Sequence, residues 1–249
     1  MGGLIGLGGA EFRLPVLVGP LRYTAKQAVP LNLAVSLITV AASLVIRGRS
    51  IPIDSLWSFR DAIAAIILGA VSAAAWGTSL AHRLSEQKLR SLVRALLFGI
   101  GLLLVTEGFL PESLPSLVGS HQIARVVAGV SFGLAIGVVS SLLGVAGGEL
   151  IIPTMVFVFG ADIKTAGSAS LIISLPTVLV AIVRYWFAGH YRERSVWLET
   201  IGPMGIGSVI GAIAGGLAVG IVPPSILKVA LGVILVYSSL HMRAGSKKH

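Results

Sequence analysis

The chain has 249 residues, of which 55% are hydrophobic and 12% are charged, and its mean hydropathy is +0.94. Soluble domains carry about 25% charged residues, so this composition excludes a disordered protein and argues against a compact soluble enzyme. The sequence has no cysteine, which excludes a disulfide framework and Cys-ligated zinc or iron–sulfur sites. The net charge is +9, and the basic residues lie in short segments between apolar runs, as in membrane proteins. This distribution does not indicate nucleic-acid binding. The expected partner is the lipid bilayer.

Taken in chain order, the apolar runs predict an all-α polytopic membrane protein. Two of the runs, 10–19 and 149–159, are too short to cross a bilayer as straight helices, and each follows a glycine cluster. Because glycine permits sharp turns, we expect each cluster to fold the preceding helix and the short run into a broken hairpin. The predicted longer helices cover residues 28–46, 61–81, 91–110, 123–143, 166–187, 199–219 and 226–241.

The two halves of the sequence resemble each other along one ungapped diagonal. An offset of 138 residues pairs Glu11 with Glu149 and Pro15 with Pro153. Chance matches are common among leucines and glycines, but not among charged residues and prolines on a single diagonal. We therefore predict an internal duplication.

The duplication defines the domain organisation. Residues 1–110 form the first repeat, 111–122 a loop between the repeats, and 123–249 the second repeat with its basic tail. The helix that begins at Ile123 would have its counterpart before Met1. We therefore expect the first helix of the first repeat to be truncated at the N-terminus.

The placement of basic residues predicts that the repeats are inverted. The Lys and Arg residues concerned lie in the segments between and after the predicted helices. Parallel copies would place eight of them on one membrane face and ten on the other, whereas inverted copies would place twelve on one face and six on the other. The positive-inside rule favours the unequal division, which also places the C-terminus in the cytoplasm. The twelve are Arg22, Lys26, Arg83, Lys88, Arg90, Arg94, Arg184, Arg192, Arg194, Arg243, Lys247 and Lys248, and the six are Arg47, Arg49, Arg60, Arg125, Lys164 and Lys228.

Inverted repeats with broken helices are typical of secondary transporters, whose sites lie near the membrane midplane. The two glycine clusters are the corresponding breaks, and the N–H groups freed there suit an anion. The alternative is that these glycines only allow close helix packing. Glu11 and Glu149 follow the two turns. Because a carboxylate at membrane depth costs about 2.5–3.5 kcal/mol, each is a candidate for proton coupling or, alternatively, a structural group that bonds to free backbone N–H groups.

A polar stripe follows each turn. Asn32, Ser36 and Thr39 are spaced i, i+4 and i+7 on one helical face, and Ser170, Ser174 and Thr177 repeat the pattern. The stripes line a solute path or form hydrogen bonds between helices. Arg13 pairs with Glu11, the interpretation we favour, or binds an anion, or lies on a water-exposed rim. The predicted substrate-binding residues are Gly8, Gly9, Glu11, Arg13, Asn32, Ser36, Gly147, Gly148, Glu149, Ser168, Ser170 and Ser174.

Glycines and alanines also recur at a spacing of four residues in three of the predicted helices. Such faces let helix backbones approach closely, and we assign them to the scaffold. They are Gly69, Ala73 and Gly77, then Gly129, Gly133 and Gly137, and finally Gly207, Gly211 and Gly215.

At Gly6-Leu7-Gly8-Gly9-Ala10-Glu11-Phe12-Arg13-Leu14-Pro15 and Gly144-Val145-Ala146-Gly147-Gly148-Glu149-Leu150-Ile151-Ile152-Pro153, the sequence resembles the sulfite exporter TauE/SafE family. That family has a glycine-rich turn, an apolar stretch and a proline in each half. The resemblance covers essentially the whole chain and implies a multi-pass inner-membrane carrier that exports sulfite, organosulfonates or related anions. The sequence departs from the family in its glutamate after each turn and in Ala10, which replaces the last glycine of the first motif.

The sequence thus predicts a secondary anion transporter, with a small anionic substrate and no cofactor, catalytic residue or metal ligand. No motif of an enzyme nucleophile, a metalloprotease or a phosphate-binding loop occurs. The alternatives are a membrane scaffold or assembly factor that transports nothing, or a carrier for a different small solute. A homodimer is compatible with the sequence.

Overall fold

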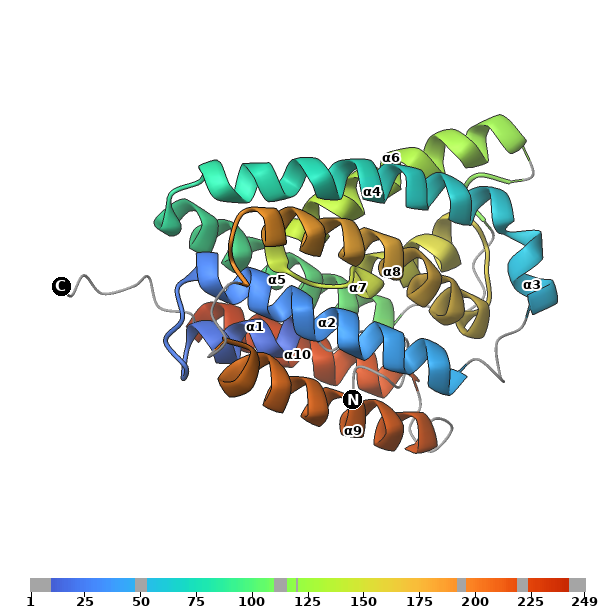
Figure 1. Cartoon of the computed structure of the whole chain (residues 1–249). Coiled ribbons are helices and arrows are strands. Elements are labelled where there is room, and N and C mark those ends of the chain that lie inside the picture. Colours follow the sequence, from blue (N-terminus) through green and yellow to red (C-terminus); the bar gives the residue numbers. More distant parts are fainter. Residues whose placement is uncertain are drawn as a thin grey trace.

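The computed structural model of the chain describes residues 10–47, 53–109, 116–119, 121–191, 196–218 and 224–241, and these ranges contain helices and turns but no strand. Figure 1 shows the helices packed side by side in one bundle. Five of them, α2, α4, α5, α6 and α8, are long and apolar enough to cross a membrane. The elements are α1 (Ala10–Val18), α2 (Ala25–Arg47), α3 (Ile53–Ser58), α4 (Arg60–Arg83), α5 (Glu86–Gly108), α6 (Gln122–Leu143), α7 (Gly148–Pro153), η2 (Thr154–Val158), α8 (Ile163–Phe187), η3 (Val196–Ile201), α9 (Gly202–Ala218) and α10 (Pro224–His241).

The predicted all-helical fold is confirmed. Each predicted long helix is present with its ends moved by a few residues, and both short runs are short helices: α1, and α7 continued by the π-helical η2. The six-residue helix α3, which leads into α4, was not predicted from the sequence.

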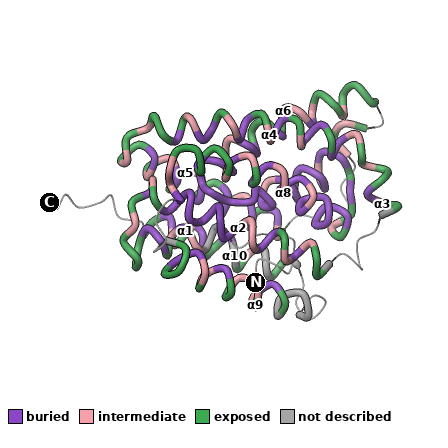
Figure 2. Tube along the Cα trace, viewed as in Figure 1, coloured by how far each residue is buried: buried purple, intermediate pink, exposed green. Residues whose placement is uncertain are grey.

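Exposed apolar side chains cover the outside of the bundle. Figure 2 shows buried residues concentrated on the inner helices α2 and α8, and exposed residues on the outward faces of α4 and α6. Large apolar side chains such as Leu68, Trp76 and Phe132 are exposed on those outer helices. In a soluble protein this surface would be unfavourable, whereas in a bilayer it faces lipid. The chain is therefore a multi-pass membrane protein.

The beginning of α2 is fixed by capping. Thr24 and Gln27 bond reciprocally, since the Thr24 backbone N–H donates to the Gln27 side chain and the Gln27 N–H donates to Thr24 Oγ1. The Glu86 carboxylate, from the first turn of α5, also accepts the backbone N–H groups of Ala25 and Lys26. Glu86 therefore ties the first turn of α2 to that of α5.

Helices that the 138-residue offset pairs run in opposite directions. Lys26 Nζ, at the start of α2, is 3.5 Å from the carbonyl oxygen of His82, whereas Arg184 Nη2, near the end of α8, is 2.9 Å from Ser79 Oγ. The start of α2 and the end of α8 therefore both lie beside the last turns of α4. The counterparts α5 and α10 are also antiparallel, because Gly101 lies against Gly232 and Gly108 lies against Ser225 and Val229. These are the directions that inverted copies would have.

Glycines hold α4 and α6 in close, parallel contact. A Cβ atom at Gly69 would overlap the carbonyl oxygen of Val130, and one at Gly133 would overlap that of Ile66. The prediction of close packing is confirmed for these two helices. It is wrong for Gly207 and Gly211 of α9, where a Cβ atom would have nothing within 4 Å. Small residues permit a close approach but do not supply the partner helix, and the surroundings of Gly215 lie outside the described residues.

This contrast gives a matched pair of substitutions. We expect Gly133→Ala to destabilise the protein by about 1–3 kcal/mol, because the new methyl group forces α4 and α6 apart. Gly211→Ala adds the same methyl group in open space, and we expect it to leave stability unchanged. Thermal unfolding of the two variants in one detergent measures the difference, and equal melting temperatures would contradict the α4–α6 packing.

Candidate functional site

The guanidinium of Arg13 lies in the centre of the bundle among polar side chains. It reaches from α1 and donates to three residues of the α2 stripe: Nε to Asn32 Oδ1 at 3.1 Å, Nη2 to Ser36 Oγ at 2.9 Å, and Nη1 to Thr39 Oγ1 at 3.1 Å. Nη1 also donates to Ser208 Oγ of α9 at 2.9 Å. Ser36 is the middle residue of α2. The positive charge of Arg13 therefore lies at about half the depth of the bundle and joins three helices.

The stripe on α2 also bonds to the beginning of α1 and to the turn after α6. Asn32 Nδ2 donates to the carbonyl oxygens of Ala10, at 2.9 Å, and Leu143, at 3.4 Å. Ser36 Oγ lies 3.3 Å from the carbonyl oxygen of Gly144. The residue that follows the first glycine cluster and the residue that precedes the second thus both bond to the side-chain amide of Asn32.

The second glycine cluster makes the sharp turn that its sequence indicates. Gly144 and Gly147 have φ angles of +66° and +82°, a backbone region that favours glycine. A Cβ atom at Gly144 would also overlap the carbonyl oxygen of Val29 in α2. From the other side, Ser174 Oγ of α8 donates to the carbonyl oxygen of Ala146 at 2.6 Å. The turn is therefore held between the polar stripes of α2 and α8.

Glu149 is buried in the first turn of α7, directly after this turn and next to the buried Gly148. Glu149 is 1% exposed, and both of its carboxylate oxygens are buried without a hydrogen-bond partner among the described residues. The alternative that Glu149 bonds to free backbone N–H groups is therefore wrong. Burial of polar oxygens without a partner costs free energy, which makes Glu149 a candidate functional residue.

Two of the predicted serines form hydrogen bonds within their own helix. Ser168 Oγ donates to the carbonyl oxygen of Lys164 and Ser170 Oγ donates to that of Gly167, both at 2.9 Å. The structure thus places Arg13, Asn32, Ser36, Ser174 and the Gly147 turn together. Gly8 and Gly9 lie outside the described residues, as does the side chain of Glu11, so its pairing with Arg13 stays a prediction.

Ser208 is a site residue that sequence reasoning missed. The repeat pairs Ser208 with Ala70, as it pairs Arg13 with Ile151. A search for residues shared by the two copies therefore discards both positions. The signal that could have found Ser208 is this shared asymmetry: two polar residues without a polar counterpart hydrogen-bond to each other at the centre of the bundle.

The end of the bundle at which α2 begins is basic. His82, Tyr185 and His190 form a cluster of rings there, with centroids 5.0–5.3 Å apart, beside Lys26 and Arg184. Burial, together with the nearby His82, lowers the pKa of His190, which is therefore neutral at pH 7. A change in transport between pH 7 and 8 is thus not expected to come from His190.

A bundle of apolar helices with a short broken helix and a polar centre defines a multi-pass membrane protein built around an internal site. Within the described residues, no group of three or more acidic or histidine side chains could hold a metal ion. The family model for the sulfite exporter TauE/SafE matches residues 1–242. The chain therefore belongs to the TauE/SafE family, a family of membrane transporters for sulfite and related anions. No curated protein and no solved structure gives a significant match.

Proposed function

We propose that the chain is a secondary transporter that exports sulfite, organosulfonates or related small anions across the inner membrane. The observation that carries this proposal is the guanidinium of Arg13 at the middle of α2, among hydroxyl and amide groups. A charged residue at the bilayer centre costs about 2.5–3.5 kcal/mol, and such residues mark substrate and ion pathways. A planar guanidinium binds two oxygens of an oxyanion through parallel hydrogen bonds.

The neighbours of Arg13 can serve an anion as well as the arginine. Ser36 and Thr39 accept hydrogen bonds from Arg13, while their own hydroxyl hydrogens go to backbone carbonyl oxygens of α2 at 2.7 and 2.8 Å. A hydroxyl group can rotate and donate elsewhere. An incoming anion would replace these neutral oxygens on the guanidinium and would then accept hydrogen bonds from the released hydroxyls.

We further propose that the two halves are inverted copies that open this site to each membrane face in turn. The opposite directions of α2 and α8, and of α5 and α10, support this arrangement. In transporters with inverted repeats, the site lies between the repeats near the midplane. The turn between α6 and α7 is bonded by Ser36 from one half and by Ser174 from the other, and would respond to the movement of either half.

Glu149 is the proton-coupling residue in this proposal, and the repeat makes Glu11 its counterpart. An ionised Glu149 would repel an anion in the centre of the bundle, whereas a protonated Glu149 would not. Binding of the anion would therefore be coupled to binding of a proton.

The basic end of the bundle faces the cytoplasm in this proposal. The described basic residues at that end include Lys26, Arg83 and Arg184, in agreement with the positive-inside rule. Because α5 begins at this end and α10 is antiparallel to α5, α10 ends there as well. The C-terminus would then lie in the cytoplasm.

Flux into proteoliposomes tests the function directly. We expect the purified protein to move sulfite or an alkanesulfonate faster than empty liposomes do, and to move a neutral sugar no faster than they do. Acetate and sulfate, tested in the same flux assay, define the charge and shape of the anions that the site accepts. If the folded protein moves no solute, it is a scaffold or assembly factor instead, and flux of the neutral sugar alone would make it a carrier of another class.

A further inference from the structure

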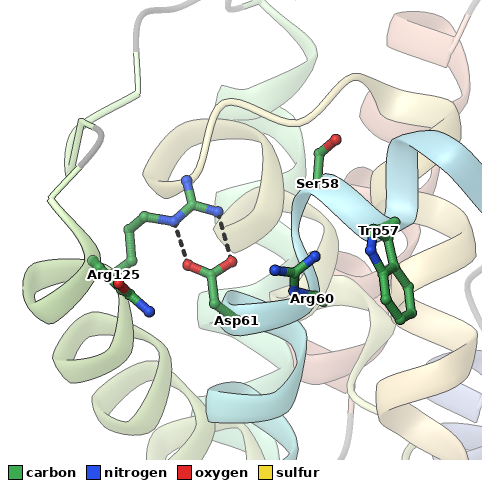
Figure 3. A pocket seen from close by; sticks show the side chains of 6 residues that line it. Trp57, Ser58, Arg60, Asp61 and Arg125 are labelled. Carbon is green, nitrogen blue, oxygen red and sulfur yellow. Dashed lines mark hydrogen bonds and ion pairs between the residues drawn. The ribbon is translucent and has the colours of Figure 1, made fainter.

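A second polar site lies at the end of the bundle opposite to Lys26 and His82. It is a pocket of about 410 Å³ where α4 and α6 begin, shown in Figure 3. Two residues of α3, two of α4 and two of α6 line it, and none of them belongs to the proposed transport site. They are Trp57, Ser58, Arg60, Asp61, Gln122 and Arg125.

Arg125 is held rigidly in the wall of this pocket. Its Nε and Nη2 atoms bond to the two carboxylate oxygens of Asp61 at 2.7 and 3.0 Å. Its guanidinium also lies 5.6 Å from the ring centres of both Phe59 and Phe159. An arginine has five N–H donors, so this pair leaves the remaining N–H groups of Arg125 for another ligand.

Arg60 gives the pocket a surplus positive charge. Its guanidinium stacks on the ring of Trp57, 5.2 Å from the ring centre, and it forms no ion pair within the described residues. In the view of Figure 3, Asp61 lies between Arg60 and Arg125. Two guanidinium groups and one carboxylate thus line the pocket, and its lining side chains carry a net charge of +1.

The helix termini add to this positive potential. Because α4 and α6 are parallel, both begin at this end of the bundle. The first turn of α6 contains no acidic residue, and the side chain of its N-cap residue, His121, makes no capping hydrogen bond. The positive ends of both helix dipoles therefore point towards the pocket, beside the hydroxyl of Ser58 and the amide of Gln122.

We propose that this pocket binds a phosphate-type oxyanion, with Arg60 and the free N–H groups of Arg125 as its ligands. The apolar surface next to the pocket favours a phospholipid headgroup as the source. Trp57 at its rim and Ile123 and Val127 on α6 are 66%, 82% and 60% exposed, as expected of residues that contact lipid. Inorganic phosphate presents the same chemistry, and the test separates the two sources. The site lies outside the transport path and does not depend on the proposed function.

The test counts bound lipids by native mass spectrometry of the purified protein, titrated in turn with phosphatidylglycerol, phosphatidylcholine and inorganic phosphate. We expect one phosphatidylglycerol to bind at least tenfold more tightly than phosphatidylcholine, and Arg60→Gln to abolish that preference. Arg83→Gln is the matched control, because Arg83 is an exposed arginine at the other end of the same helix. Gln122→Ala, which removes a donor but no charge, should weaken binding about threefold.

The outcomes separate the sources and can overturn the site. If inorganic phosphate binds to the unsubstituted protein and displaces phosphatidylglycerol, the ligand is a free anion. Equal lipid binding by the Arg60→Gln and Arg83→Gln variants would overturn the proposal, as would an absence of binding to the unsubstituted protein. Circular dichroism of each variant checks its fold, which we expect to survive because Arg60 contacts an exposed ring.

Discussion

Replacing Arg13 with glutamine is expected to reduce anion transport by at least 100-fold while the bundle stays folded. Each hydrogen bond to a charged group contributes about 1.5–3 kcal/mol, and the substitution removes the charge that an anion would bind. Arg13→Lys keeps the charge but loses the planar fork that reaches Asn32, Ser36 and Thr39. We expect that variant to retain weak transport with a raised KM. Initial rates in proteoliposomes measure both effects.

Two controls separate binding from folding in this series. Arg94→Gln removes an exposed arginine from α5 and should transport like the unsubstituted protein. Ser208→Ala removes one acceptor of Arg13 but no charge, and should lower the rate no more than fivefold. Gel filtration and thermal unfolding check that each variant is folded. Unchanged transport by folded Arg13→Gln protein would show that Arg13 is only a structural link between α1, α2 and α9.

Replacing Glu149 with glutamine is expected to abolish the pH dependence of transport. Within the described part of the chain, both carboxylate oxygens of Glu149 are buried without a hydrogen-bond partner. The amide, which resembles the protonated acid in size and charge, therefore fits the same place. In the unsubstituted protein, deprotonation of Glu149 would place a negative charge near the anion path. We expect its rate of alkanesulfonate transport to rise as the pH falls from 8 to 6, and the rate of the Glu149→Gln variant to be constant. An alkanesulfonate is the substrate of choice because its own charge does not change in this range.

The matched control for this substitution is Glu199→Gln, because Glu199 is exposed in η3. It should keep the pH profile of the unsubstituted protein. If the Glu149→Gln variant retains the same slope between pH 6 and 8, Glu149 does not couple protons to transport, and Glu11 becomes the candidate to test next.

The helices could be predicted from the sequence because length and apolarity alone determine a membrane span. The stripe of Asn32, Ser36 and Thr39 was also predictable, because its spacing places all three residues on one face of α2. The spacing could not show what the stripe faces. The structure shows Arg13 on one side and the turn at Gly144 on another, contacts that depend on how α1, α2, α6 and α9 pack together.

The repeat was informative where the copies agree and misleading where they differ. It led to the Gly147 turn and to Ser174, which lie at the centre of the bundle. It also equated the glycine faces of α4 and α9, although a Cβ atom at Gly207 or Gly211 of α9 would have nothing within 4 Å. It gave no reason to single out Ser208, because a match between copies cannot indicate a residue that only one copy has.

Counterflow tests whether one anion site at Arg13 opens alternately to the two membrane faces. Proteoliposomes are loaded with an unlabelled anion that the flux assay has identified as a substrate, and are then diluted into a trace of the same anion carrying a label. An alternating site predicts a transient accumulation of label above its equilibrium level, and no accumulation with the Arg13→Gln variant. Label that only relaxes to equilibrium would indicate a channel, and accumulation that survives in the Arg13→Gln variant would place the site elsewhere.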